Sequence, residues 1–144
     1  MTTYQIELWS EVWPEIRYIA PAHYAEVQID GGVYVDTLLA DEKNGSLICF
    51  TARESGGLVG YWWGKVFRNS LIRGDLCAFN QAIYVLPEFR NEGIGKNMIY
   101  HVEKSLKDMG VAFIYISSRE KKDITPILSH LGYEKAEVIM EKRL

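Results

Sequence analysis

The feature that most constrains the fold is an apolar helical pattern placed between two strand-like segments. Apolar residues recur at spacings of three and four over 94–109, and Gly110 is well placed as the residue after a helix. They are Ile94, Met98, Ile99, Val102, Leu106 and Met109. A β-rich run over 77–86 ends at Pro87, and an uninterrupted apolar run over 111–116 is typical of a strand covered on both faces. This succession predicts a helix packed on a sheet.

The N-terminal third of the sequence predicts one strand and one interrupted helix. Alternation over 4–9 indicates a strand, and 10–28 has a helical pattern. Pro21 should kink or split that helix, and the segment Asp30-Gly31-Gly32 should end it. The pattern over 33–45 is too weak to predict a regular element.

The remaining segments complete a mixed sheet. Two β-rich runs, 47–53 and 58–67, are joined by a glycine turn over 54–57 and predict a hairpin. A threonine N-cap followed by proline begins a short helix within 125–132, and 133–140 is predicted to be a last strand. The chain is therefore expected to form an α/β (α+β) domain with helices on the faces of one sheet.

Length and composition restrict the class of protein. With 144 residues, of which 48% are hydrophobic, the chain is expected to fold as a single domain over residues 1–144. A net charge of −3 gives no basic excess for nucleic acid or a membrane surface. Cys49 and Cys77 lie in apolar stretches away from other ligand types, which predicts reduced core thiols and no metal site. Without a leader pattern or a spanning apolar run, we expect a cytoplasmic protein.

The loop before the long helix predicts an anion site. It reads Arg90-Asn91-Glu92-Gly93-Ile94-Gly95-Lys96. Two glycines at a helix start let backbone N–H groups point outward, and the helix dipole adds partial positive charge, so a pyrophosphate would be held by the backbone. The spacing fits neither a dinucleotide fingerprint nor a P-loop. The alternative is that both glycines only permit tight packing between strand and helix.

These residues resemble the signature of the GNAT superfamily of acyl-CoA-dependent N-acyltransferases. That signature is Arg or Gln, two residues, Gly, one residue, and Gly or Ala, which Arg90, Gly93 and Gly95 match. The approach over 83–87 and the later Leu131-Gly132-Tyr133 also resemble the family's fourth strand and its closing turn.

The resemblance implies a fold, a substrate and a chemistry. It implies a mixed, splayed central sheet of about six or seven strands flanked by helices. Acetyl-CoA would be the acyl donor, and a neutral primary amine would attack its thioester directly. The pantetheine arm would pair with the backbone of Ile83, Tyr84 and Val85. The pyrophosphate would rest on the N–H groups of Asn91, Glu92, Gly93, Ile94, Gly95 and Lys96.

Two positions depart from the family pattern. Many members have a glutamate where this chain has Gln81, and a tyrosine acid where this chain has Leu128. The Gln81 amide cannot take the amine proton, but as a catalytic candidate it could order a water or accept a hydrogen bond from the amine. His23 and Glu26, three residues apart on one helix face, are the predicted substitutes, with the carboxylate orienting the imidazole or raising its pKa. A solvated polar face is the alternative for this pair.

Two functions remain open at this stage. The first is an N-acetyltransferase acting on a small amine, an amino acid or a protein lysine. The second is a non-catalytic coenzyme A binding or regulatory module. The pair Trp62-Trp63 should point to opposite faces of a strand, with one ring in the core and the other free for an acceptor wall or a homodimer contact.

Overall fold

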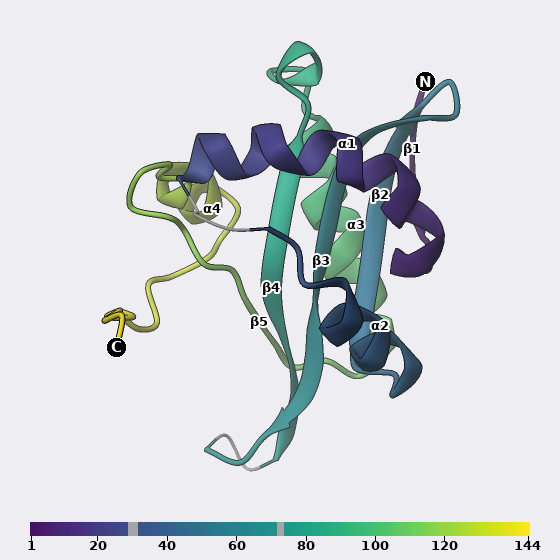
Figure 1. Ribbon diagram of the computed structural model, residues 1–144. Helices are drawn as coiled ribbons and strands as arrows, with labels where there is room; N and C mark the ends of the chain where they lie inside the picture. The colour runs from purple at the N-terminus through teal and green to yellow at the C-terminus, as the bar shows by residue number, and fades with distance from the viewer. Residues whose placement is uncertain (29–31, 72–73) are drawn as a thin grey trace.

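The computed structural model describes residues 1–28, 32–71 and 74–144, which form one five-stranded sheet with helices on both faces (Figure 1). The elements are β1 (Thr2–Ile6), α1 (Trp9–Val27), α2 (Val35–Lys43), β2 (Leu47–Glu54), β3 (Gly57–Asn69), β4 (Asp75–Val85), the 3-10 helix η1 (Pro87–Phe89), α3 (Ile94–Asp108), β5 (Phe113–Tyr115) and α4 (Thr125–His130). The strands follow one another in chain order, antiparallel except for the parallel pair β4 and β5.

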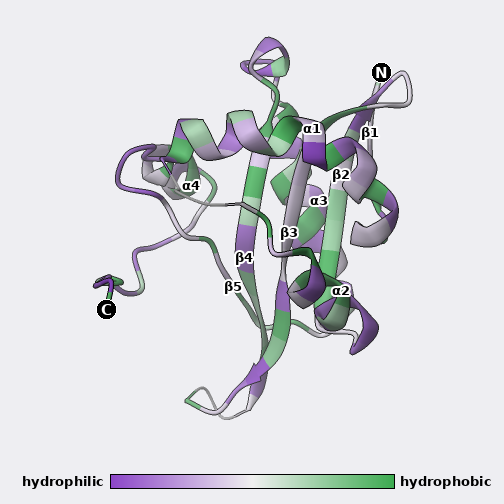
Figure 2. Ribbon diagram, in the orientation of Figure 1, coloured by the Kyte–Doolittle hydropathy of each residue, from purple (hydrophilic) through white to green (hydrophobic). Residues whose placement is uncertain are grey.

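Helices cover both faces of the sheet. In Figure 1, α1 and α2 lie on one face and α3 on the other. Apolar and polar bands alternate along α1 in Figure 2, as expected for a helix with one buried side. The buried residues of α1 are Trp9, Val12, Ile16, Ala20 and His23. Those of α3 are Ile94, Met98, Ile99, Val102 and Leu106, so each face of the sheet has its own core.

A β-bulge in β4 lies where this strand leaves its neighbour. Trp63 pairs with Ala82 and the next residue of β3 pairs with Asn80, so Gln81 is an extra residue in β4. The buried Asn80 amide donates hydrogen bonds to the carbonyls of Trp63 (3.3 Å) and Ala82 (2.8 Å). These bonds satisfy backbone groups at the bulge and fix its position.

The strands β4 and β5 separate immediately before this bulge. Their pairing joins Cys77 to Phe113, Ala78 to Ile114 and Phe79 to Tyr115, and it goes no further. Beyond Phe79, β4 continues to Val85 beside β3 alone within the described chain. The edge of β4 from 80 to 85 is therefore open on the side where β5 would lie.

The structure confirms the main predicted elements. The hairpin, the strand before the long helix, the long helix itself and the short helix within 125–132 all form near their predicted bounds. The mixed sheet with helices on its faces is confirmed, although five strands form in the described residues instead of six or seven. Cys49 and Cys77 are buried free thiols, as predicted.

Three predictions for the N-terminal half were wrong. The first strand ends at Ile6, because Trp9 already belongs to α1 and is buried. Pro21 does not divide α1, since core contacts before and after it hold both halves in one helix. Residues 33–45 contain α2, whose weak pattern reflects a buried face shared by Leu38 and the charged Asp41. The predicted end of this helix at Asp30-Gly31-Gly32 falls mostly on residues 29–31, which lie outside the described residues.

Predictions for the strands after α3 and α4 were also wrong. The run over 111–116 forms a strand of three residues, and Phe113 is 45% exposed, so β5 is not covered on both faces. Residues 133–140 form no strand, and Val138, Ile139 and Met140 are largely exposed.

The prediction that one ring of the tryptophan pair is free was wrong as well. Trp62 and Trp63 are 0% and 3% exposed, respectively. Trp62 packs edge-on against Phe50 on the α3 face, and Trp63 packs edge-on against Trp9 of α1. Both rings are buried because helices cover both faces of the sheet at this point.

Within the described residues no helix is long and apolar enough to cross a membrane.

The bulge leaves almost no space at Gly64. A Cβ there would lie 2.5 Å from the Phe79 carbonyl oxygen and 2.7 Å from a ring atom of Trp62. We expect Gly64→Ala to lower the free energy of unfolding by about 2 kcal/mol or more, measured by urea unfolding. Gly57→Ala is the matched control, because its Cβ would meet only the Glu54 carbonyl oxygen at 3.5 Å. Equal stability of the two variants would contradict this packing.

Candidate active site

The N-terminus of α3 has the geometry of an anion site. Asn91 and Gly93 have φ values of 66° and 81°, and Gly93 is the residue that precedes the helix. No side chain caps the first turn, and that turn contains no acidic residue. The first backbone N–H groups of α3 are therefore available to an external acceptor.

Arg90 has a structural role that the sequence did not predict. Its Nε donates a hydrogen bond to the Val85 carbonyl (2.9 Å), and its Nη2 donates one to Glu26 Oε2 (2.7 Å). The guanidinium also lies over the ring of Tyr84, 5.2 Å from its centroid. Arg90 thus joins the end of β4 to the last turns of α1, and its charge faces a carboxylate.

Glu26 binds cations instead of the imidazole predicted for it. Besides Arg90, Lys122 Nζ lies 3.2 Å from Glu26 Oε1, so the loop after β5 is tied to α1. Burial acts to raise the pKa of Glu26, but the hydrogen bonds from Arg90 and Lys122 outweigh it and leave this pKa below its ordinary value. Glu26 is therefore an ionised linker at neutral pH.

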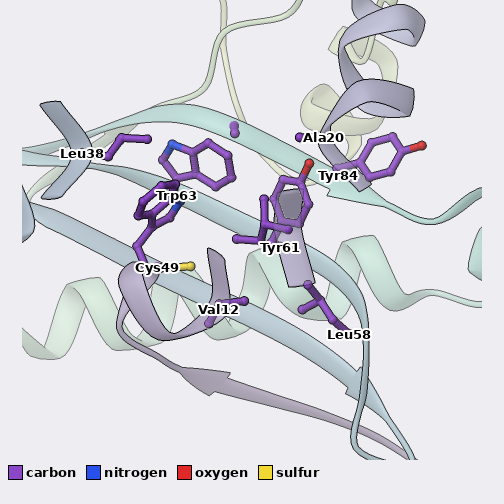
Figure 3. Packing of buried hydrophobic residues seen from close by; sticks show 11 residues of the cluster. Val12, Ala20, Leu38, Cys49, Leu58, Tyr61, Trp63 and Tyr84 are labelled. Atoms are coloured by element: carbon purple, nitrogen blue, oxygen red, sulfur yellow. The ribbon is translucent and has the colours of Figure 1, made fainter. Parts of the chain in front are cut away.

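His23 is buried among aromatic rings. It is 5% exposed, its Nδ1 lies 2.8 Å from the hydroxyl oxygen of Tyr61, and its ring stacks on Tyr84 with centroids 4.6 Å apart. Figure 3 shows Tyr61 and Tyr84 beside Ala20 of α1. Burial lowers the pKa of His23 to about 4, against the opposing charge of Glu26. The Glu26 carboxylate does act to raise the pKa of His23, as predicted, but burial has the larger effect.

Gln81 stands at the bulge and faces solvent. With Lys65, Phe67 and Phe79 it lines a shallow hollow on the face of β3 and β4. Lys65 Nζ lies 3.3 Å from Asp41 Oδ2, so the positive charge of Lys65 beside this hollow is partly balanced. Gln81 at this bulge lies next to the open edge of β4.

The structure brings most of the predicted site residues to one end of the sheet. Tyr84 contacts both His23 and Arg90, and Arg90 connects them to Glu26. Leu128, which stands where many members have the tyrosine acid, is 6% exposed and belongs to the core. Its hydrocarbon side chain has no proton to donate. Among the described residues, no group of three or more His, Cys, Asp and Glu side chains is placed to hold a metal ion.

Sequence reasoning did not predict three of the contacts at this site. Tyr61 bonds His23, Asn80 fixes the bulge, and Lys122 holds Glu26. A polar asparagine inside an apolar strand was the one available signal, because such a residue in a central strand requires buried partners. Nothing in the spacing of Tyr61 distinguished it from its neighbours, and Lys122 lies in a charged run, 119–123, whose pattern did not indicate Glu26 as a partner.

Comparison with known proteins identifies the class of protein that this fold and site define. The profile of the acetyltransferase (GNAT) family matches residues 3–124. The chain belongs to this family, and the predicted class, an acetyl-CoA-dependent acyltransferase, is confirmed. A comparison with curated proteins gave no match.

Solved structures agree with the family in fold. A predicted acetyltransferase from Clostridium acetobutylicum, with acetyl-CoA, has a TM-score of 0.78 and 14% identity, covering 99% of this chain and 96% of that one. An aminoglycoside acetyltransferase from an uncultured soil metagenomic sample, in complex with sisomicin, gives the same values. AAC(6')-Iy, in complex with the bisubstrate analogue CoA-S-monomethyl-acetylneamine, has a TM-score of 0.72 and 22% identity, covering 100% and 98%.

The burial of His23 predicts a specific pH dependence of stability. The unfolded chain binds a proton on this imidazole near pH 6.5, whereas the folded chain binds it only near pH 4. The neutral form therefore stabilises the fold fully above pH 6.5, and this contribution is lost as the pH falls toward 4. Between pH 7.5 and 4.5 the loss should be about 2 kcal/mol.

A comparison of variants separates the contribution of His23 to stability from the contributions of other groups that titrate at acidic pH. His23→Asn keeps an acceptor for the Tyr61 hydroxyl but cannot be protonated, so its free energy of unfolding should fall by about 2 kcal/mol less over the same interval. His130→Asn, at an exposed position, should behave as the unmodified protein does. An unchanged pH slope in His23→Asn, measured by urea unfolding, would exclude a buried neutral His23.

Proposed function

We propose that this protein is an N-acetyltransferase that transfers the acetyl group of acetyl-CoA to a primary amine by direct attack in a ternary complex. The observation that carries the proposal is the open edge of β4, which leads directly to the uncapped N-terminus of α3. An extended strand edge and a helix N-terminus in series suit a ligand with an amide-containing arm and a pyrophosphate. Membership of the family supports the same donor.

The donor would be bound mainly by backbone. We assign the pantetheine arm to the edge over Ile83, Tyr84 and Val85. We assign the pyrophosphate to the N–H groups of the turn and first helical residues, 91–96. Gly95 supports this assignment, because a Cβ there would have ordinary contact with Val85 and no other near neighbour, so the approach to the helix is clear. Arg90 would support the turn from behind through its bond to the Val85 carbonyl.

The chain's own residues would then position the amine and handle its proton. Acetyl-CoA supplies an activated acyl group, and a thiolate is a tolerable leaving group, so correct placement contributes much of the acceleration. Gln81 at the bulge would accept a hydrogen bond from the amine or order a water. His23 is neutral at pH 7, and with its low pKa it would serve as a hydrogen-bonding group more readily than as a base. Glu26 would position Arg90.

The acceptor is the least constrained part of the proposal. A small amine, an amino acid or a protein lysine each carries the required primary amine. Two of the structurally similar proteins are described with aminoglycoside-type ligands, sisomicin and an acetylneamine derivative, so aminoglycosides belong among the acceptors to be tested. The hollow beside Gln81, with Lys65 and two phenylalanines, is the proposed acceptor wall.

Calorimetric titration with acetyl-CoA and free coenzyme A, followed by thiol release against amines, polyamines, aminoglycosides and lysine peptides, tests the function. We expect binding of both ligands and acceptor-dependent thiol release. Binding without release for any acceptor would favour the alternative, a non-catalytic coenzyme A module. Absence of binding would exclude both, and would leave the glycines of this loop with a packing role alone.

Substitution of Gly95 tests the pyrophosphate assignment. Its φ is not in the left-handed region, so side chains are compatible with the backbone, whereas Gly93 with a φ of 81° would be strained by any substitution. Gly95→Glu should weaken coenzyme A binding at least tenfold by placing a negative charge in the first turn. Gly95→Gln, of nearly the same size without the charge, is the matched control and should weaken binding less. Equal affinities would contradict the assignment.

Substitution of Gln81 tests the position of the amine. Gln81→Glu introduces a carboxylate that can accept the amine proton, so we expect kcat/KM to rise several-fold, and more strongly above the carboxyl pKa. Gln81→Ala should lower kcat/KM because no polar group then faces the amine. A clear fall in Gln81→Glu, measured by thiol release at several pH values, would show that the neutral amide has a specific role.

A further inference from the structure

The loop 116–124 lies across the open edge of β4 from the strand itself. Pairing between β4 and β5 ends at Phe79 and Tyr115, and the loop 116–124 then leads from β5 to α4. In Figure 1 this loop passes beside the C-terminal end of α1. After the pairing ends, the sheet therefore has two separate sides here, the edge of β4 from 80 to 85 and the loop 116–124.

A chain of polar contacts joins these two sides again at their far end. Arg90 Nε donates a hydrogen bond to the Val85 carbonyl (2.9 Å), and Arg90 Nη2 donates one to Glu26 Oε2 (2.7 Å). The other carboxylate oxygen, Glu26 Oε1, lies 3.2 Å from Lys122 Nζ in the loop. With strand pairing at one end and these contacts at the other, the edge of β4 lies within a closed ring of protein.

The backbone that carries Lys122 is held in place independently of Glu26. Asp123 Oδ1 accepts hydrogen bonds from the N–H (2.9 Å) and the hydroxyl (2.7 Å) of Thr125, the first residue of α4. The N–H of Lys122 donates a hydrogen bond to the Arg119 carbonyl (3.0 Å). The loop therefore presents the Lys122 side chain to α1 from a fixed position.

The contact between Lys122 and Glu26 is the weakest part of the ring. The Lys122 side chain is 46% exposed, against 30% for Arg90, and its ammonium group has one ion-pair partner among the described residues. Arg90 is held by the Val85 carbonyl, by Glu26 and by the ring of Tyr84. Exposed ion pairs of lysine contribute little to stability and are screened by salt, so the ring should open at Lys122.

We propose that the ion pair of Glu26 and Lys122 is a clasp on the donor site, which closes around the arm of bound acetyl-CoA and opens to admit or release it. The inference rests on the proposed function, because the arm assigned to the edge 83–85 would lie inside the ring. A ligand in that position exchanges either lengthwise or sideways through an opened ring. Sideways entry lets the contacts along the strand edge form together, whereas lengthwise entry would make and break them one by one.

Exchange kinetics test the clasp. The probe is a coenzyme A analogue with a fluorescent etheno-adenine, measured by stopped flow. In Lys122→Met, association and release should both accelerate about two- to fivefold, the factor by which an exposed ion pair favours its closed state, and the equilibrium affinity should change less than either rate. Lys121→Met, at the neighbouring exposed lysine, removes the same charge and should leave both rates unchanged. Lys122→Arg should retain the slower exchange.

The outcomes separate the clasp from the proposed function. Absence of binding to the unmodified protein would contradict the proposed donor site, and the clasp with it. Binding with unchanged rates in Lys122→Met would overturn the clasp alone. Slower association together with faster release would overturn it as well, because Lys122 would then act as a contact to the phosphates of the ligand.

Cross-linking tests the ring directly. In the double variant Glu26→Cys, Lys122→Cys the two new thiols replace the ion pair, and the natural Cys49 and Cys77 are buried. The variant is loaded with acetyl-CoA, which has no free thiol, and is then joined by a short bis-maleimide. Release should be slower by about tenfold or more than in the same variant treated with N-ethylmaleimide, which modifies both thiols without joining them. Equal release rates in a cross-linked sample would overturn the proposal.

Discussion

The separation of β4 from β5 after Phe79 is the constraint on which the rest of the site depends. Pairing stops there, and the bulge at Gln81 follows immediately, with the Asn80 amide bonded to the two carbonyls around it. This combination leaves an open strand edge in the middle of a sheet, which is unusual because unpaired backbone groups are costly unless a ligand or water meets them. The edge leads to the N-terminus of α3, so unpaired backbone groups of a strand and of a helix lie in line.

The charged side chains near this edge form ion pairs that link separate segments of the chain. Arg90 bonds the Val85 carbonyl and Glu26, and Lys122 bonds Glu26 from the other side. Three segments distant in sequence are thereby fixed around Tyr84, whose ring also stacks on His23. The consequence is an ionised Glu26 and a neutral His23, so neither resembles a base tuned to neutral pH. Under the proposed function, the main contribution of these residues would be to position the amine.

Local pattern predicted the parts of the fold whose periodicity is strong. The spacing of apolar residues in α3 and the glycine turn of the hairpin each have a direct local cause. The sequence pattern did not predict α2, because the buried face of this helix contains the charged Asp41, whose partner Lys65 lies on β3. The segment over 133–140 has a strand pattern but no partner strand in its own described chain, because pairing is a property of two segments and not of one.

The sequence by itself determined the uncapped glycine loop before α3, because glycines at a helix start act through their own backbone and need no distant partner. It also determined the family, through residues of that loop and its flanking strand and turn. The tertiary structure alone decided what the charged and titratable groups do. Arg90 became a structural link and His23 a buried neutral ring, because hydrogen-bond partners and burial come from segments far apart in the chain, and these set a pKa.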